Sequence, residues 1–123
     1  MTPIKGVVVG HAGLAAALVD AVEQIAGAGS GLIAVSNTDC DRGALEERIV
    51  QAALPGPTLV FIDMPSGSCH FAAMRRFETV PDVRVVTGVN LAMLLEFVFH
   101  REGDLADVAR HLAEVGARAV GAP

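Results

Sequence analysis

The chain has 123 residues, and its 9 lysines and arginines against 14 aspartates and glutamates give a formal net charge of −5. An acidic surface disfavours binding to nucleic-acid phosphates, and 52% hydrophobic with only 19% charged residues excludes a disordered chain. The length predicts a single domain over residues 1–123, with an aliphatic core because Trp and Tyr are absent and Phe occurs five times.

The first half of the chain predicts two strand–helix units. Residues 4–9 are a β-branched run typical of a buried strand. A helix is expected next, with apolar residues at spacings of four, four and three: Leu14, Leu18, Val22 and Ile25. Residues 32–35 predict a second strand, and Asp39 or Asp41 can cap the helix after it. The inward residues of that second helix are expected to be Leu45, Ile49 and Ala53.

The second half continues the alternation. Residues 58–62 predict a third strand that ends at Asp63, and a Pro-Ser-Gly-Ser turn leads into a helix near residues 69–76. Residues 83–87 predict the fourth strand, and Asn90 can cap the next helix. That helix presents the apolar residues Leu91, Leu94, Leu95 and Val98.

Asp104 is expected to cap a final helix, and residues 117–120 are expected to add a short last strand, antiparallel to the others. The four earlier strands are nearly continuous apolar runs, which is typical of a parallel sheet covered on both faces. Right-handed crossovers then predict an open, doubly wound α/β fold with a mainly parallel four-stranded sheet and helices on both faces.

Ligands in such folds bind beyond the carboxyl ends of the strands, where neighbouring strands diverge in chain order. This rule selects Gly10, His11, Asp63 and residues 87–90. An imidazole is substantially neutral at pH 7 and can act as a nucleophile or base. Because adjacent strands lie about 4.8 Å apart, Asp63 is expected to reach His11 and fix its tautomer. The alternatives are a loop histidine without a role and an aspartate that caps the turn.

Ser66, Gly67 and Ser68 precede a helix, so their N–H groups are expected to form an anion-binding turn at its N-terminus. The chain has neither a P-loop nor a dinucleotide-binding glycine motif. No ligand spacing of a known zinc type occurs around Cys69 and His70, so a bound metal ion is not expected.

The two remaining histidines, His100 and His111, are interpreted as surface residues late in helices. The only cysteines, Cys40 and Cys69, are too few for a disulfide framework and fit a reducing compartment. No signal-peptide cleavage and no membrane span are expected. We therefore expect a soluble, cytoplasmic protein.

Three segments, VVVGHAGLAAALVDAVEQIAG, VFIDMPSGSCHFAA and VVTGVNLAMLLE, stand in an order and spacing that resemble one family. This is the enzyme IIA component of the mannose-type sugar phosphotransferase system, and the resemblance extends over residues 4–120. It implies that His11 is phosphorylated by the histidine-containing phosphocarrier protein and passes the group to a IIB component. It also implies that Asp63 orients the imidazole and that Ser68 belongs to the turn around the phosphoryl group. It further implies that the protein works without a metal or organic cofactor and is a homodimer.

The chain departs from the family pattern at several positions. Ala12 replaces a glycine, Pro65 and Ser66 replace an aromatic residue and a glycine, and Ala92 replaces a proline. The Cys69-His70 pair stands where Pro-Phe is usual. The changes at Pro65 and Ser66 leave open a regulatory binding module of the same fold without phosphotransfer. The related phosphotransfer subunit of dihydroxyacetone kinase, which shares the histidine after a strand, is a second alternative.

Overall fold

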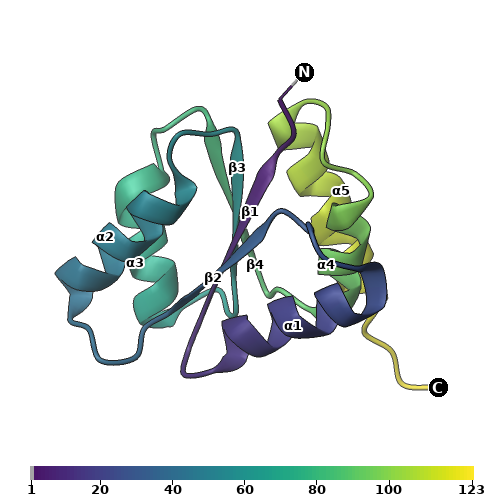
Figure 1. Cartoon of the computed structure of the whole chain (residues 1–123), viewed down its shortest axis with the longest axis horizontal. Coiled ribbons are helices and arrows are strands. Elements are labelled where there is room, and N and C mark those ends of the chain that lie inside the picture. The colour runs from purple at the N-terminus through teal and green to yellow at the C-terminus, as the bar shows by residue number, and fades with distance from the viewer. Residues whose placement is uncertain (1) are drawn as a thin grey trace.

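The computed structural model describes residues 2–123 as an alternation of strands and helices (Figure 1). The strands are β1 (Lys5–Gly10), β2 (Leu32–Ser36), β3 (Thr58–Ile62) and β4 (Val83–Thr87). The helices are α1 (Leu14–Ala26), α2 (Arg42–Ala53), α3 (Gly67–Phe77), α4 (Leu91–Val98) and α5 (Leu105–Arg118). None of the helices in residues 2–123 has the length and apolar character needed to cross a membrane.

The four strands form one parallel sheet in the order β2-β1-β3-β4. The sheet therefore grows outward from β1 in both directions, and β1 and β3 are its central pair. Val9 of β1 stands opposite Ile62 of β3. The predicted α/β fold is confirmed, and its topological switch point, where successive strands begin to be added on the other side of β1, lies between the carboxyl ends of β1 and β3.

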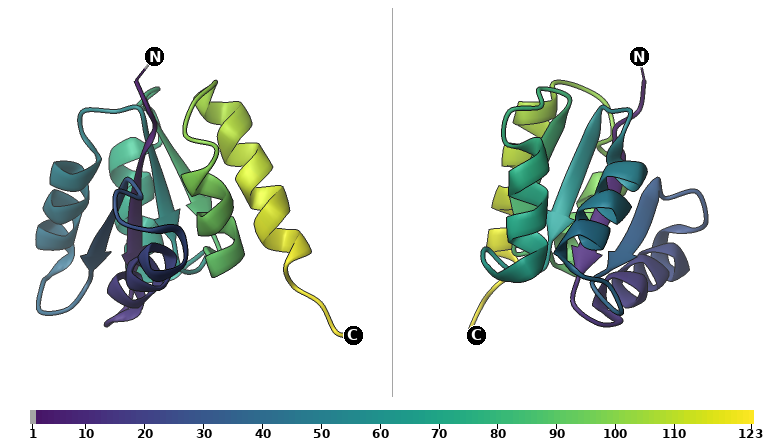
Figure 2. Two further views of the ribbon diagram at one scale, coloured as in Figure 1. Left: turned by 45° about the vertical axis from the view of Figure 1, so that its right-hand side comes forward. Right: turned by 90° about the vertical axis from the view of Figure 1, so that its left-hand side faces the viewer.

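Helices cover both faces of the sheet because successive strand side chains point to opposite sides. Val8 and Phe61 lie in the core cluster beneath α1, α4 and α5, whereas Val9 and Ile62 lie in the cluster beneath α2 and α3. Figures 1 and 2 show these two helical layers on either side of the strands. Burial on both faces explains why the strands are continuous apolar runs rather than alternating ones.

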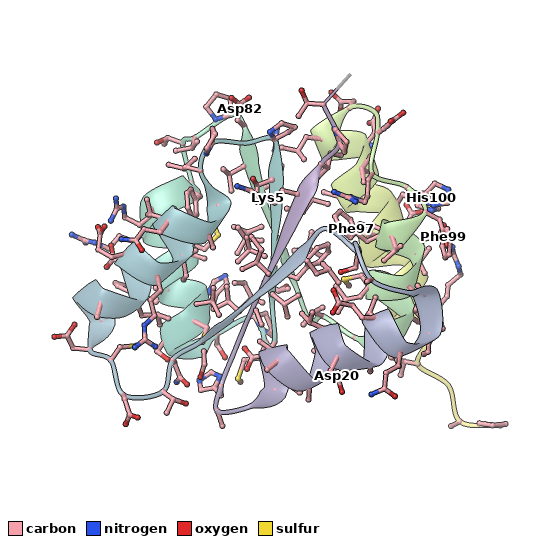
Figure 3. The ribbon with its side chains drawn as sticks, viewed as in Figure 1. Lys5, Asp20, Asp82, Phe97, Phe99 and His100 are labelled. Carbon is pink, nitrogen blue, oxygen red and sulfur yellow. The ribbon has the colours of Figure 1, made fainter. Side chains whose placement is uncertain are left out.

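The largest side chains of the core lie under α4. The rings of Phe61 and Phe97 meet edge to face, with centroids 5.3 Å apart, a geometry that adds to the burial of their area. Figure 3 shows Phe97 directed inward, while Phe99 at the end of the same helix points outward and is 74% exposed.

The three predicted aspartate and asparagine caps are confirmed. Asp41 accepts a hydrogen bond from the Ala44 N–H at 2.8 Å, and Asn90 and Asp104 do the same for the third residue after each of them. Each cap satisfies an N–H that has no partner within its helix.

One prediction about packing and one about secondary structure are wrong. Leu14 and Ile25 are 45% and 64% exposed, because α1 turns Ala15 and Val22 toward the sheet instead. The short strand expected over residues 117–120 is not formed in the single chain, because α5 continues to Arg118.

Candidate functional site

The site lies at the carboxyl ends of the two central strands. His11 directly follows β1 and Asp63 directly follows β3, and the Asp63 N–H donates to the Val9 carbonyl oxygen at 3.2 Å. This bond extends the pairing of the two strands by one residue beyond the sheet. The backbone thus delivers both side chains to one point, as the position of their strands predicts.

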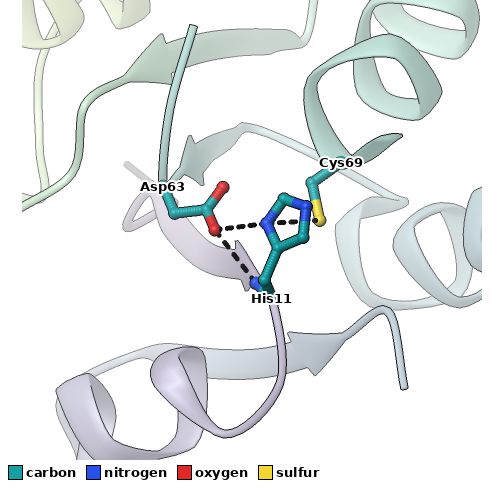
Figure 4. Close-up of side chains that lie close together, drawn as sticks. All are labelled: His11, Asp63 and Cys69. Atoms are coloured by element: carbon teal, nitrogen blue, oxygen red, sulfur yellow. Dashed lines mark hydrogen bonds and ion pairs between the residues drawn. The ribbon is translucent and has the colours of Figure 1, made fainter. Parts of the chain in front are cut away.

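His11 and Asp63 form a close pair (Figure 4). The His11 Nδ1 and Asp63 Oδ2 atoms are 2.6 Å apart, and the same oxygen accepts the His11 backbone N–H at 3.0 Å. The Asp63 side chain is 9% exposed, whereas that of His11 is 41% exposed. An aspartate on Nδ1 favours the tautomer with the proton there, which leaves the lone pair of Nε2 free.

The second carboxylate oxygen of Asp63, Oδ1, is buried and has no hydrogen-bond partner among residues 2–123. An unpaired buried carboxylate oxygen costs free energy. The carboxylate is therefore held by its bonds to His11 alone, and its charge is directed at the imidazole.

The N-terminus of α3 lies against the other side of the imidazole. A Cβ atom at Gly67 would lie 3.7 Å from His11 Cε1 and 3.8 Å from His11 Nε2. Ser66 occupies the cap position but makes no side-chain hydrogen bond to the helix. The first N–H groups of α3 therefore stay without a side-chain acceptor at the end of the helix that attracts anions.

The turn before α3 has its left-handed backbone position at Gly67 and not at Ser66. Ser66 is in extended backbone with φ of −157°, which any residue adopts, while the left-handed position falls on Gly67 with φ of +88°. A glycine therefore stands where the conformation requires one. Ser68 follows as an exposed residue in the first turn of the helix.

Cys69 contributes a third group beside the imidazole. Its Sγ lies 3.9 Å from His11 Nδ1. Burial, followed by the negative charge of Asp63, raises the pKa of the Cys69 thiol. The thiol is therefore protonated near neutral pH and is neither a strong nucleophile nor a ready metal ligand. Ligand atoms of His11, Asp63 and Cys69 do lie within 4.8 Å of one another.

His70, whose role the sequence left open, lines a groove beside the site. The groove has a volume of about 730 Å³ and shares Gly67 and Ser68 with the turn described above. On its rim the Arg42 guanidinium lies 4.5 Å from the centre of the Phe71 ring, and Phe71 is 47% exposed.

The last residue of β2 and the loop after it contribute residues that sequence reasoning missed. Asn37 Oδ1 accepts the Ala12 N–H at 3.1 Å, and Ser36 Oγ donates to the Ala12 carbonyl oxygen at 2.7 Å. These bonds hold Ala12 at a φ of +51° directly after His11. The rule about strand ends could have identified these residues from the sequence, because β2 ends at the same edge of the sheet as β1 and β3.

Of residues 87–90, which the same rule selected, Asn90 has a structural role. Asn90 Oδ1 caps α4 and Asn90 Nδ2 donates to the Gly116 carbonyl oxygen at 2.9 Å, which ties the start of α4 to the end of α5.

The chain is similar to a known protein family over most of its length. A model of the family described as PTS system fructose IIA component, abbreviated EIIA-man, matches residues 5–115. The chain belongs to this mannose-type IIA family of the phosphotransferase system. No individually curated protein gives a significant sequence match.

Solved structures of such proteins have the same fold. The mannose/sorbose-specific IIA subunit of the phosphotransferase system from Enterococcus faecalis is 26% identical, with a TM-score of 0.82 over 100% of this chain and 96% of that chain. The phosphotransferase component EIIA from Streptococcus agalactiae is 18% identical, with a TM-score of 0.89 over 97% of this chain and 96% of that chain.

Proposed function

We propose that this protein is a phosphohistidine carrier in which His11 Nε2 is the atom that is phosphorylated. The observation that carries the proposal is the 2.6 Å contact between His11 Nδ1 and Asp63 Oδ2. It leaves Nε2 as the free nitrogen, against the N-terminus of α3 at Gly67. A nucleophilic nitrogen next to unpaired helix N–H groups suits an incoming phosphoryl group.

The protein receives the phosphoryl group in one covalent step and donates it in another. The lone pair of Nε2 attacks phosphorus as the bond to the nitrogen of the donor phosphohistidine breaks, and the donor imidazole keeps that bond's electron pair. The proton on Nδ1 stays in the hydrogen bond with Asp63, whose negative charge stabilises the imidazolium that develops. The N–H groups of Ser66, Gly67 and Ser68, together with the Ser68 hydroxyl, stabilise the equatorial oxygens. Positioning and electrostatics supply the catalysis.

The family suggests the donor and the acceptor. We propose that the histidine-containing phosphocarrier protein phosphorylates His11, and that a IIB component receives the group for sugar uptake or its regulation. The relay operates in the cytoplasm and requires no cofactor. We also propose a homodimer, because the segment after α5 extends away from the sheet (Figure 2) and its Val120 is 80% exposed.

The direct test is phosphorylation by phosphoenolpyruvate, enzyme I and the phosphocarrier protein. We expect one phosphoryl group per chain, labile in acid and stable in alkali, as for a phosphoramidate. His11→Ala is expected to abolish the label. His70→Ala, a second histidine beside the same turn, is the matched control and is expected to keep it. A label that survives His11→Ala or moves to His70 overturns the site.

The same experiment separates the alternatives. A chain that stays unlabelled with active partners is a binding module of the same fold. A labelled chain that transfers to a dihydroxyacetone kinase and not to a IIB component belongs to that kinase's relay.

A further inference from the structure

A second group of ligating side chains lies outside the phosphorylation site, on the layer formed by α4 and α5. Glu96 of α4 and His100 just beyond its end are four residues apart, which places them on one side of the helix. His111 comes from α5. Glu96 Oε2 lies 2.6 Å from His111 Nε2 and 3.3 Å from His100 Nδ1. The three ligand atoms all lie within 4.8 Å of one another.

These separations suit the coordination sphere of a zinc ion. Zinc–nitrogen and zinc–oxygen bonds of about 2.0–2.2 Å in a tetrahedron place the ligand atoms about 3.3 Å apart. The Glu96–His100 pair already has this separation. The Glu96–His111 pair has to open by roughly 0.7 Å, as an ion replaces the hydrogen bond between them. An ion bound at His100 Nδ1 also replaces the 3.2 Å contact of that atom with the Glu96 carbonyl oxygen.

The electrostatics of the cluster also favour a cation. The hydrogen bond from His111 is the largest cause that lowers the pKa of Glu96, and the charges of His100, His111 and Arg118 act in the same direction. Glu96 is therefore a carboxylate at neutral pH and gives the cluster its negative charge. Of the groups facing it, Arg118 is the one that opposes a metal ion, and the two imidazoles become ligands when neutral.

Access is open on the solvent side. The side chains of Glu96, His100 and His111 are 30%, 52% and 41% exposed. Figure 3 shows His100 and Phe99 on the outer side of this layer, away from the sheet. An ion can enter without unfolding the chain, and solvent water can fill the coordination position that the protein leaves open.

We propose that Glu96, His100 and His111 form a binding site for a divalent transition metal ion, with Zn²⁺ as the preferred occupant. Two imidazole nitrogens and one carboxylate oxygen form a donor set that suits zinc in proteins with an open fourth position. The bound ion joins the end of α4 to the middle of α5. It complements the Asn90–Gly116 bond, which joins the same two helices at the start of α4.

The test is calorimetric titration of the full chain with Zn²⁺ at neutral pH. We expect one ion per chain, and a melting temperature that rises with Zn²⁺ because the ion binds the folded state preferentially. Glu96→Gln and His111→Gln keep hydrogen-bonding capacity but each removes a ligand. Each is expected to weaken binding by at least about tenfold, the lower limit seen even for outer-shell partners. Binding should also fall as pH drops and the imidazoles become protonated.

The His11 site provides the matched control, because His11, Asp63 and Cys69 are the other group of ligand atoms among residues 2–123 that lie close enough to bind a metal. Binding is expected to persist in His11→Ala and in Cys69→Ser. Co²⁺ in place of Zn²⁺ is expected to give a tetrahedral spectrum without a thiolate charge-transfer band. Absence of Zn²⁺ binding, a thiolate band, or binding lost in Cys69→Ser and kept in His111→Gln overturns the proposal.

Discussion

Asp63 directs one oxygen atom, Oδ2, at both the backbone and the ring of His11. The bond to the backbone N–H fixes the position of the His11 main chain, and the bond to Nδ1 fixes the orientation of the imidazole ring. Its buried second oxygen has no competing partner in the described residues. The Asp63 carboxylate therefore holds both the conformation of the loop after β1 and the tautomer of the imidazole.

This arrangement predicts the effect of Asp63→Asn. The amide oxygen can still accept a hydrogen bond, but the charge that stabilises the developing imidazolium is lost. A charge-assisted hydrogen bond contributes about 1.5–3 kcal/mol, so we expect phosphorylation to slow roughly ten- to two-hundred-fold without being abolished. Rapid-quench measurement of the transfer rate checks this. Asp39→Asn, in an exposed loop, is the control, and an unchanged rate in Asp63→Asn contradicts the proposed role.

The pair itself was predictable from the sequence, whereas its neighbours were not. His11 and Asp63 each follow an apolar strand, and one rule about strand ends brings them together. The approach of Cys69 depends on the rotation of α3 about its axis, which no local pattern specifies. The Glu96–His111 contact likewise depends on how two helices pack, although the spacing of Glu96 and His100 was visible.

The N-terminal turn of α3 has one position that requires glycine. Gly67 has a φ of +88°, and a side chain there would also face the His11 ring. We expect Gly67→Ala to lower the free energy of unfolding by about 1–2 kcal/mol and to slow phosphorylation, because the helix N–H groups shift relative to Nε2. Urea unfolding and the transfer rate measure the two effects.

Ser66→Gly is the matched substitution one residue earlier. Ser66 is in extended backbone and makes no capping bond, so the transfer rate is expected to stay unchanged. A faster rate in Ser66→Gly would mean that the native turn is not fully competent, and it would favour the regulatory alternative.

The side-chain amide of Asn90 uses its oxygen to cap α4 and its nitrogen to bind the end of α5. Asn90→Ala removes the helix cap and the bond to the Gly116 carbonyl oxygen, and we expect a loss of about 1–3 kcal/mol in the free energy of unfolding. Asn90→Ser keeps a capping oxygen and is expected to lose less. Equal losses in the two variants would show that the cap contributes little.

Helix caps were the best-predicted feature of the elements, because a cap is a contact between residues three apart. The inward face of α1 was predicted less well. Its apolar spacing includes Leu14 and Ile25, which are exposed, while the smaller Ala15 packs against the sheet. Periodicity identifies a helix, but the space available beneath it decides which side chains are buried.

At the scale of the whole molecule, the parallel order β2-β1-β3-β4 follows from four apolar strands joined by helices. The sheet leaves β2 and β4 as edges. A groove of about 330 Å³ runs beside β4 and is lined by Val83, Arg84 and Val85 of that strand. An edge strand with unpaired N–H and C=O groups is open to pairing with another chain.

Residues 119–123 are the segment that we expect to pack against a second chain. They follow α5 without forming a strand in the single chain and point away from the sheet in Figure 2. The strand was expected over residues 117–120 because that stretch is apolar; α5 takes the first two of these residues, and Val120 beyond it is 80% exposed. A β-strand of this length is stable only when it pairs with an existing sheet.

We therefore predict that the protein is a homodimer in which this segment of each chain packs on the other. Multi-angle light scattering at tens of micromolar is expected to give twice the chain mass. Val120→Asp introduces a charge into the apolar contact and is expected to shift the dimer toward monomer while leaving the circular dichroism spectrum and the labelling of His11 intact. Ala122→Asp, two residues further along, carries the same charge and is expected to remain dimeric. A monomeric wild-type chain at these concentrations contradicts the prediction, and a dimer unaffected by Val120→Asp places the interface elsewhere on the molecule.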